Sequence, residues 1–352
     1  MSMQQFYNKN QITHVNWEMV EAYLHSANLG LSNSPLQVEQ FSAGYSNLTY
    51  YIRIGEWRAV LRRPPIGPLP PKAHDMKREF DILIKLNRFF SLAPRPYLYC
   101  EDESIMDRHF YIMEKKDGVV IDDSLPPEYI ENPGTSQLVS NAVIDTLVQL
   151  HEVDYKEAGL ESIGYPDGYL SRQVHGWIKR YQASKTDDID GVESLEKWLI
   201  THIPSSPAPT IVHNDFKLNN MMFLRQNPGK VIGLFDWELS TIGDPLTDLA
   251  GMLAYWTEPG EAETGLATIT TNPGFASRKE MLEKYAKKSG RDVSQIYFYL
   301  AFAFYKIAVI LQQIYYRWKI GEAKDERFGR LNVGIKNLMK QAIRAHRNEI
   351  LI

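Results

Sequence analysis

The chain has 352 residues, of which 44% are hydrophobic and 23% are charged, and its formal net charge at pH 7 is -4. This composition is typical of an ordinary globular protein long enough for two parts with substantial cores, and it excludes disorder for most of the chain. The small acidic excess gives no reason to expect nucleic acid as a partner, because proteins that bind nucleic acid carry a strong basic excess.

Cysteine usage and apolar runs bear on compartment and membrane. The one cysteine, Cys100, cannot form an internal disulfide, and the N-terminal residues lack the apolar run of a signal peptide, so we expect a reducing cytoplasm. Residues 296–316 are the one membrane-like stretch, but Lys306 interrupts it and two glutamines close it. We therefore expect a buried helix of a large domain and no membrane partner.

The first third of the chain shows strand patterns with one inserted helix. Residues 16–30 have apolar residues at helical spacing, with Asn at the start and Gly at the end, which predicts an N-terminal helix. Residues 36–64 alternate polar and apolar residues and break at two glycines, which predicts successive hairpin strands. Helical spacing returns over residues 72–89, and a further strand is expected over residues 109–121.

Beyond the first third, the composition favours helices. The runs 137–153 and 169–184 and most of 276–350 are helical by pattern, with two strand-like runs between them. The sequence therefore predicts an α+β chain. A small β-rich lobe should occupy residues 1–115, and a larger, mainly helical lobe should occupy residues 116–352.

Each of the two strand-like runs is followed by a group of polar residues. In the run 211–220, IVHNDFKLNN, an apolar pair precedes Asp215, Lys217 and Asn220, and Asp236 follows the second apolar run. Phosphoryl transfer needs this inventory, because the transferred group is highly anionic and the protein mainly positions the nucleophile and neutralises charge. The pair of runs therefore indicates a phosphotransferase site.

These residues can be given chemical roles. Asp215 would orient the acceptor hydroxyl or accept its proton, and Lys217 would lie near the γ-phosphate. Asn220 and Asp236 would hold Mg²⁺ through hard oxygen ligands. The expected cofactors are thus ATP and Mg²⁺, and the expected partner is a small molecule that bears a hydroxyl group.

The two motifs resemble those of the aminoglycoside phosphotransferase and choline kinase family of small-molecule kinases. The resemblance lies in HxDxxxxN at His213, Asp215 and Asn220, and in DxE at Asp236 and Glu238. It is closer still to bacterial phosphotransferases and to the kinase-like domain fused to some acyl-CoA dehydrogenases, and it runs nearly end to end. It implies a protein-kinase-like bilobal fold, with Glu238 as either a further metal or substrate contact or a solvated turn residue.

The nucleotide-binding parts of this family can be sought by position. Residues 42–48, SAGYSNL, stand where the phosphate-covering loop should lie, and Ser42, Gly44 and Ser46 would let backbone N–H groups approach the phosphates. The stretch lacks the GxGxxG pattern and also suits a plain hairpin turn. Residues 112–118 are similar to the kinase hinge, which assigns nucleotide contacts to the following residues: Met113, Glu114 and Lys115.

The kinase lysine is replaced by arginine in this chain. Residues 59–62, AVLR, stand where kinases carry VAIK, so Arg62 takes the place of the lysine, and Glu79 in the following helix is its candidate partner. A planar guanidinium can pair with two phosphate oxygens. Arg63 adjoins Arg62 on the opposite strand face and remains the alternative.

Several neighbouring residues have structural explanations. His213 is interpreted as a core histidine that bonds backbone, and Trp237 as packing. Asp244 followed by Pro245 suits a helix N-cap and first helical residue. By the resemblance, Asp248 anchors the catalytic loop and supports it without taking part in the chemistry.

Three classes of function explain these residues to different extents. An ATP-dependent kinase for a small-molecule hydroxyl explains all of them, and a protein acceptor is disfavoured because the HRD, DFG and APE segments are missing. A metal-dependent hydrolase would use His213, Asp215, Asp236 and Glu238, but leaves Lys217 unexplained. A nucleotide-binding module without catalysis would be expected to lack Asp215, Asn220 or Asp236, and all three are present.

The acceptor and the oligomeric state are not specified by these motifs. From residue 296 onwards Lys and Arg outnumber acids, and the acids Glu258, Glu261 and Glu263 lie in a segment that we expect to be flexible. A site for a polycationic aminoglycoside should be rich in carboxylates. The long apolar helix could continue into an apolar wall, so the favoured hypothesis is a neutral or anionic acceptor. With the resemblance, the specific hypothesis is a hydroxyacyl thioester or a hydroxy acid.

Overall fold

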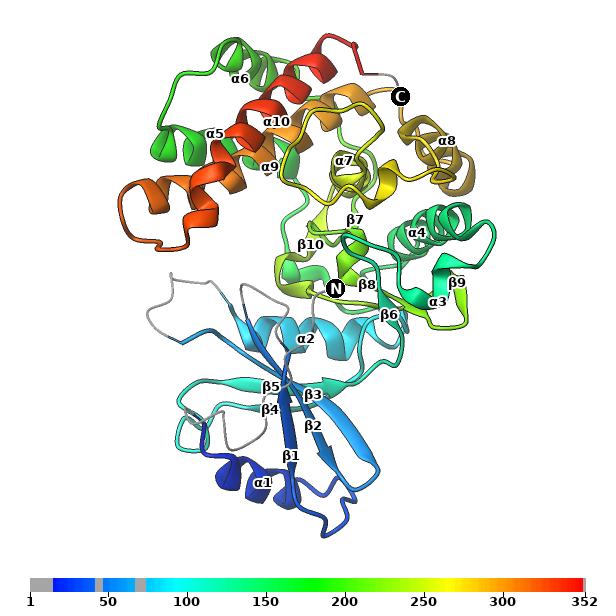
Figure 1. Cartoon of the computed structure of the whole chain (residues 1–352), viewed down its shortest axis with the longest axis vertical. Helices are drawn as coiled ribbons and strands as arrows, with labels where there is room; N and C mark the ends of the chain where they lie inside the picture. The colour runs from blue at the N-terminus through cyan, green and yellow to red at the C-terminus, as the bar shows by residue number, and fades with distance from the viewer. Residues whose placement is uncertain (1–14, 42–46, 67–73, 351–352) are drawn as a thin grey trace. The chain divides into compact units, whose positions relative to one another are not determined.

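The computed structural model describes residues 15–41, 47–66 and 74–350 (Figure 1). The chain divides into two compact units. Unit 1 consists of Met1–Asp117 and Gly233–Glu238, and unit 2 consists of Gly118–Ile232 and Leu239–Ile352. The six-residue segment at 233–238 therefore belongs with the N-terminal residues, which the predicted division at residue 115 did not anticipate.

Unit 1 is built on a five-stranded antiparallel sheet with the strand order β1-β2-β3-β5-β4. Its strands are β1 (Gln37–Gln40), β2 (Leu48–Ile54), β3 (Trp57–Arg63), β4 (Pro96–Cys100) and β5 (Phe110–Glu114), and its helices are α1 (Trp17–Ser26) and α2 (Met76–Leu86). Tyr50, Ile52 and Ile54 of β2 are buried in alternation, as expected for a strand with one face on a core.

Helix α2 directs an acid into the interior of unit 1. Its buried residues follow helical spacing, and Glu79 is among them with Met76 and Leu83. Asp75 caps the helix by accepting a hydrogen bond from the backbone N–H of Arg78. The helix packs against β4 and β5, so Glu79 lies on the face that is directed toward the sheet.

Unit 2 is mainly helical, with short strands. Its main helices are α3 (Pro127–Ile130), α4 (Thr135–His151), α5 (Tyr169–Ser184), α6 (Val192–Thr201), α7 (Pro245–Tyr255), α8 (Arg278–Ser289), α9 (Ile296–Lys319) and α10 (Leu331–His346). Two small sheets have the orders β10-β7 and β6-β8-β9. Their strands are β6 (Val119–Val120), β7 (Thr210–Val212), β8 (Met221–Leu224), β9 (Asn227–Leu234) and β10 (Thr241–Gly243). The single-turn 3₁₀ helices are η2 (Glu161–Ile163), η3 (Leu218–Asn220), η4 (Trp237–Leu239), η5 (Ile269–Thr271) and η6 (Glu326–Arg330).

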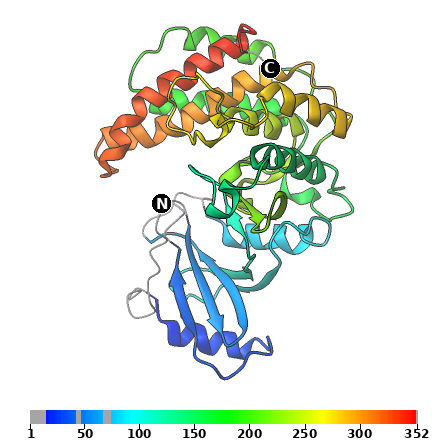
Figure 2. The same cartoon turned by 45° about the vertical axis from the view of Figure 1, so that its right-hand side comes forward.

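Helix α9 lies in the core of unit 2. It packs against α5, α7 and α10, and α10 runs alongside it in both ribbon views (Figures 1 and 2). Within the described residues α9 is the one helix long and apolar enough to cross a membrane, and 72% of its most apolar window is buried inside the protein. Burial by neighbouring helices favours the predicted core helix.

The acidic segment before α8 is held in place. Arg278 at the start of α8 is buried, and its guanidinium pairs with Glu258 and Glu261 and donates a hydrogen bond of 2.8 Å to the carbonyl oxygen of Leu253. The expectation that these two acids lie in a flexible segment is wrong, because both carboxylates are used to hold a buried cation.

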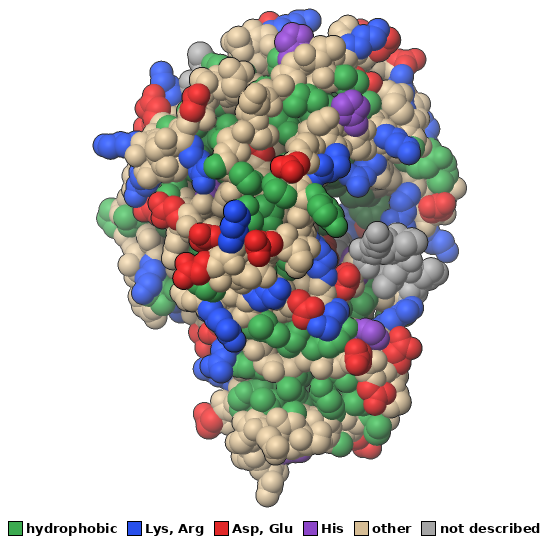
Figure 3. All heavy atoms as spheres, turned by 180° about the vertical axis from the view of Figure 1, so that it is seen from behind, with side chains coloured by type: hydrophobic (Ala, Val, Ile, Leu, Met, Phe, Trp, Pro, Cys, Tyr) green, Lys and Arg blue, Asp and Glu red, His purple; other side chains and the backbone are tan. Residues whose placement is uncertain are grey.

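The surface carries charges of both signs. On the face shown in Figure 3, Lys and Arg side chains are interspersed with Asp and Glu, and hydrophobic side chains lie among them.

Candidate active site

Arg62 on β3 lies among three acids within unit 1. Its Nη2 is 2.5 Å from Asp236 Oδ1 and 4.0 Å from Glu238 Oε2, and its Nε is 3.4 Å from Glu79 Oε2. Burial opposes the charged guanidinium, but Glu79 and Asp236 raise the pKa of Arg62 above its usual range. The cluster thus keeps Arg62 charged while it is removed from water.

Glu79 is the most strongly buried acid of this cluster. Burial raises the pKa of Glu79 to about 7, partly opposed by Arg62 and reinforced by Asp236 and Glu238. Its Oε1 also accepts a hydrogen bond of 3.2 Å from the backbone N–H of Trp237. Glu79 therefore joins the cation on β3 to the segment that carries Asp236.

Arg63 points to the other face of β3. Its guanidinium is fully buried and lies 2.7 Å from Asp107. Successive strand residues face opposite sides of a sheet, so only one of the two arginines can meet Glu79. The structure places Arg62 in that position, as the alignment with the kinase lysine predicts.

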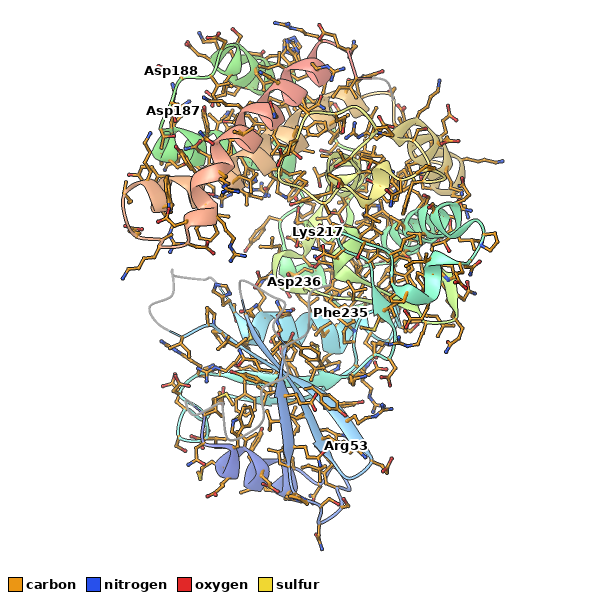
Figure 4. All side chains as sticks on the ribbon, in the orientation of Figure 1. Arg53, Asp187, Asp188, Lys217, Phe235 and Asp236 are labelled. Carbon is orange, nitrogen blue, oxygen red and sulfur yellow. The ribbon has the colours of Figure 1, made fainter. Side chains whose placement is uncertain are left out.

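Asp236 has an unusual backbone conformation. Its φ is 70°, in the left-handed region that residues other than glycine seldom adopt. The next residue, Trp237, is 1% exposed, donates a hydrogen bond of 2.8 Å from Nε1 to the Leu234 carbonyl, and packs edge-on against Phe90. This packing holds the strained turn and presents the Asp236 carboxylate to Arg62 (Figure 4).

Glu238 has contacts that the sequence did not predict. Asn47 donates a hydrogen bond of 3.1 Å from its side-chain amide to Glu238 Oε2, and His74 Nδ1 lies 3.7 Å from the same oxygen. The side-chain oxygen of Asn47, Oδ1, in turn lies 2.8 Å from His74 Nδ1. The position of Glu238 is therefore fixed by side chains, which disfavours the interpretation as a solvated turn residue.

The hinge-like residues lie at the end of β5. Met113 is buried and pairs with Val60 of β3, and the backbone N–H of Glu114 donates a hydrogen bond of 2.8 Å to the Arg95 carbonyl. Lys115 pairs with Asp117. Their nucleotide contacts remain a prediction, and the predicted phosphate-loop residues Ser42, Gly44 and Ser46 lie outside the described residues.

The loop after β7 in unit 2 is held by a buried aspartate. Asp248, in the first turn of α7, accepts hydrogen bonds from the backbone N–H groups of His213 at 2.5 Å and Asn214 at 2.7 Å. His151 Nε2 lies 3.5 Å from the same carboxylate. Burial opposes ionisation, but the neighbouring His151 and the hydrogen bonds from the backbone lower the pKa of Asp248. Asp248 therefore anchors the loop as an ionised acceptor.

Strand pairing explains how this anchor arises. β7 and β10 are antiparallel, with Gly243 opposite Thr210, so the chain leaves β10 beside the start of β7, and α7 then packs against β7. Asp244 is the N-cap of α7, accepting a hydrogen bond of 3.0 Å from the backbone N–H of Leu246, and Pro245 is the first helical residue. Asp248 follows one turn later on the buried side of the helix.

Asp215, Lys217 and Asn220 meet within this loop. Lys217 Nζ lies 3.0 Å from Asp215 Oδ1, and Asn220 Nδ2 donates hydrogen bonds of 2.8 Å to both the carbonyl oxygen and Oδ2 of Asp215. The amide nitrogen of Asn220 is thus used, and its side-chain oxygen remains for another ligand. Asn214, which directly precedes Asp215, has a φ of 67°, and its side-chain oxygen accepts a hydrogen bond of 2.9 Å from the Tyr169 hydroxyl.

A cavity of about 590 Å³ opens beside Asp215 in unit 2. Its walls come from η2, α5, the loop after β7, α7 and α9, and they include Asp215, Trp177, Tyr255 and Lys306. This volume is in the usual range for small-molecule sites. A carboxylate in the wall of a mixed polar and apolar cavity is the arrangement expected for a group that acts on a bound molecule.

Comparison with known proteins assigns the family. The sequence profile of the Phosphotransferase enzyme family matches residues 37–280. The human protein acyl-CoA dehydrogenase family member 11 is 34% identical over 314 residues, which cover 87% of this chain and 40% of that protein. The chain belongs to the phosphotransferase enzyme family. It spans well under half the length of this curated relative.

Solved structures have the same fold. A protein from Ralstonia eutropha described as an aminoglycoside phosphotransferase is 31% identical, with a TM-score of 0.78 over 94% of this chain and 98% of that one. Choline kinase from Cryptosporidium parvum gives 0.62 at 15% identity, covering 96% and 98% of the two chains. Aminoglycoside phosphotransferase APH(4)-Ia, in complex with AMP-PNP and hygromycin B, gives 0.58 at 16%, covering 93% and 98%. The α+β, protein-kinase-like fold is confirmed.

For this phosphotransferase, the hydrolase alternative loses support. His213 is fully buried, and its Nδ1 accepts a hydrogen bond of 3.3 Å from the backbone N–H of Asp215. Within the part of the chain that the structure describes, no group of three or more His, Cys, Asp and Glu side chains is arranged to hold a metal ion. His213 therefore has the structural role that the sequence suggests.

Sequence reasoning missed several residues of the cavity. Lys306 was interpreted only as an interruption of an apolar helix, and Trp177 and Arg180 only as part of a helical pattern, yet all three line the cavity. His151 was assigned no role and contacts Asp248. A charged residue in the middle of an apolar helix was the available signal, because such a charge needs a reason to be buried.

Proposed function

We propose that this phosphotransferase moves the γ-phosphoryl group of ATP to a hydroxyl group of a small molecule. The proposal is supported by the family assignment, and by the AMP-PNP and hygromycin B bound in a structure of the same fold. In this reaction the acceptor oxygen forms a bond to the γ-phosphorus as the bond to the β,γ-bridging oxygen breaks, so ADP leaves and the hydroxyl proton is lost.

The observation that carries the proposal is the arrangement around Asp215. One carboxylate oxygen lies 3.0 Å from the ammonium group of Lys217, the other accepts from Asn220, and the residue lines the cavity. An acceptor hydroxyl bound in the cavity would donate its hydrogen bond to Asp215, which orients it and receives its proton. Lys217 would neutralise charge that develops on the transferred group.

The residues predicted to hold Mg²⁺ have suitable chemistry. Asp236 and Glu238 direct carboxylate oxygens toward one cation, the guanidinium of Arg62, and Asn220 keeps its side-chain oxygen unused by Asp215. Hard oxygen donors of this kind suit Mg²⁺. When bound, the ion would neutralise phosphate charge. Arg62 would then offer its planar donors to phosphate oxygens.

We further propose a hydroxyacyl-type acceptor, such as a hydroxyacyl thioester or a hydroxy acid. The curated relative is named as an acyl-CoA dehydrogenase, and this chain matches 40% of it. The cavity has an apolar wall formed by Tyr255, Phe302, Ile307 and Ile310. Glu258 and Glu261, which could have received ammonium groups, are paired with Arg278. These features disfavour a polycationic aminoglycoside.

The proposal can be tested with γ-labelled ATP, Mg²⁺ and fractions of small metabolites. We expect label to pass to a hydroxyl-bearing compound that mass spectrometry can identify, and the Asp215→Asn variant to transfer far less. Nucleotide binding without transfer to any fraction would instead indicate a binding module. Labelled phosphate that appears without an acceptor would indicate a hydrolase.

A further inference from the structure

We propose that Lys306 and Arg180 bind an anionic group of the acceptor and thereby select acids over neutral or cationic alcohols. The inference rests on the proposed phosphotransfer, because it assigns the acceptor's second anchoring point in the same cavity. Both residues line that cavity together with Asp215.

Lys306 is a partly buried lysine on α9 that lines the cavity. Its Nζ donates a hydrogen bond of 3.2 Å to the Asn214 carbonyl and lies 5.6 Å from the centre of the Trp177 ring. Within the described ranges, no carboxylate lies within 4.0 Å of this ammonium group. An ammonium has three donors, so donors remain after the bond to Asn214.

The electrostatic surroundings of Lys306 are poorly balanced. Burial lowers the pKa of Lys306, Asp248 and Asp215 act in the opposite direction, and the cations Arg180 and Lys217 lower it further. The two acids already receive hydrogen bonds, Asp248 from backbone N–H groups and Asp215 from Asn220. A bound anion would supply the missing countercharge and offset the cost of burying the ammonium.

Arg180 on α5 approaches the same indole. Its guanidinium carbon lies 4.4 Å from the centre of the Trp177 ring, and no salt bridge from Arg180 to a carboxylate is formed in the described part of the chain. Arg172, on the same helix, differs because its guanidinium donates to the carbonyl oxygens of Tyr165 and Asp167. Arg180 and Lys306 are therefore the cavity cations whose donors are least used by the protein.

The position of Lys306 limits where the anionic group lies on the acceptor. Because Lys306 donates to the residue that directly precedes Asp215, an anion on Lys306 and a hydroxyl on Asp215 belong to nearby parts of one molecule. The remaining, apolar part can lie against Phe302, Ile307 and Ile310. A cationic acceptor would instead be repelled by Lys306 and Arg180, because neither cation is paired with a carboxylate in the described part of the chain.

The test compares matched acceptors with and without charge. Straight-chain hydroxyoctanoates, with the hydroxyl at successive positions, would be assayed beside their methyl esters using wild type, Lys306→Met and Arg180→Gln. We expect wild type to favour the best acid over its ester by at least about tenfold in kcat/KM, the scale of one charged hydrogen bond. Both variants should lose this preference, mainly through a higher KM for the acid.

A matched control lies on the same helix. Lys319 is at the exposed end of α9 and lies 3.7 Å from Asp187 in the loop after α5 (Figure 4), so Lys319→Met should keep the acid preference. If Lys306 had only a structural role, Lys306→Met would reduce activity on acid and ester equally. The inference would be overturned by that result together with an unchanged acid preference in Arg180→Gln. It would also be overturned if wild type did not distinguish acid from ester.

The position of Lys306 favours a carboxylate close to the hydroxyl over a phosphate of a thioester carrier, because the pantetheine arm separates carrier phosphates from the acyl hydroxyl. Two further arms test this choice. Coenzyme A thioesters of the same hydroxy acids would be compared with the free acids. A thioester preference that Lys306→Met and Arg180→Gln abolish assigns the site to carrier phosphates. A free-acid preference that they abolish assigns it to the carboxylate.

A binding measurement separates this inference from the proposed function. Binding of octanoate and of octanol is measured by calorimetry. No nucleotide is added, so no turnover takes place. We expect octanoate to bind wild type and to bind Lys306→Met at least about tenfold more weakly. If no acceptor is ever phosphorylated but this difference holds, the proposed function fails and the anion site stands. Equal octanoate binding by both proteins overturns the site.

Discussion

Two cations of this protein, the buried Arg62 and the partly buried Lys306, are compensated in different ways. Arg62 in unit 1 lies within 4.0 Å of the carboxylates of Glu79, Asp236 and Glu238. Lys306 in unit 2 has a backbone carbonyl and an aromatic ring as its nearest partners. The first charge is paired with carboxylates, whereas the second has no carboxylate within 4.0 Å among the described residues, which is why we propose that Lys306 recognises a ligand in the cavity.

The aspartates of unit 2 show the same contrast. Asp248 is buried and its two oxygens accept backbone N–H bonds, so its charge is used to hold the loop. Asp215 lines the cavity and is held by Lys217 and Asn220. Asp248 is therefore used as an anchor, whereas Asp215 faces the cavity and is the residue that we propose takes part in the reaction.

The sharpest way to break this separation is to neutralise Asp215. The Asp215→Asn variant should lower turnover by about 10²-fold or more, because it can no longer accept the hydroxyl proton, while nucleotide affinity stays nearly unchanged. Turnover is measured by phosphoryl transfer, and affinity by calorimetry. An equal loss of ATP binding would mean that Asp215 is a metal ligand. Asp145→Asn serves as the matched control, because the Asp145 side chain is exposed on α4 and pairs with Lys288.

The acids around Arg62 should respond differently from Asp215. Asp236→Asn removes a charged oxygen ligand, so it should weaken binding of the Mg²⁺–nucleotide complex by at least about tenfold. Calorimetry with and without Mg²⁺ measures this effect. Binding that is unchanged in the presence of Mg²⁺ would show that Asp236 serves only as the partner of Arg62.

The two adjacent arginines provide a smaller and more specific comparison. Arg62→Ala should raise the KM for ATP roughly tenfold, because it removes a cation from the acidic cluster, and Arg62→Lys should retain part of the activity. Arg63→Ala should chiefly lower the free energy of unfolding, since it leaves Asp107 without its partner. Steady-state kinetics and chemical denaturation measure the two effects. A larger rise in KM from Arg63→Ala would contradict the assignment.

A separate effect is expected on the pH dependence of stability. The folded protein holds the pKa of Glu79 at about 7, above its ordinary value of 4.5, so the folded state binds this proton more tightly than the unfolded state. The resulting stabilisation is full below pH 4.5 and is lost as the pH rises to about 7. Between about pH 5 and 7.5, the free energy of unfolding of wild type should fall by on the order of 2 kcal/mol more than that of Glu79→Gln.

Denaturation at a series of pH values provides this measurement. A wild type and a Glu79→Gln variant with parallel pH profiles would show that Glu79 remains ionised throughout, with Arg62 as the dominant influence on its pKa.

The sequence by itself predicted the β-rich and helical parts. Polar and apolar residues alternate over β2, and apolar residues recur at helical spacing over α2 and α9, and both patterns can be read from neighbouring residues alone. It also placed Asp215, Lys217 and Asn220 together, since they are within six residues on one loop and short-range geometry brings them into contact. Arg62 was favoured over Arg63 by its alignment with the kinase lysine, and the structure decided between them, because successive strand residues face opposite sides of the sheet.

Only the tertiary structure decided which distant residues share a site. Glu79 meets Arg62 because α2 packs on the sheet, and Asp248 meets the loop at His213 because β7 pairs with β10. Lys306 and Arg180 approach one indole because α5 and α9 pack together. These contacts depend on helix packing and strand pairing across many residues, and no local pattern encodes such pairings, so the sequence indicated the charges without showing which of them are balanced.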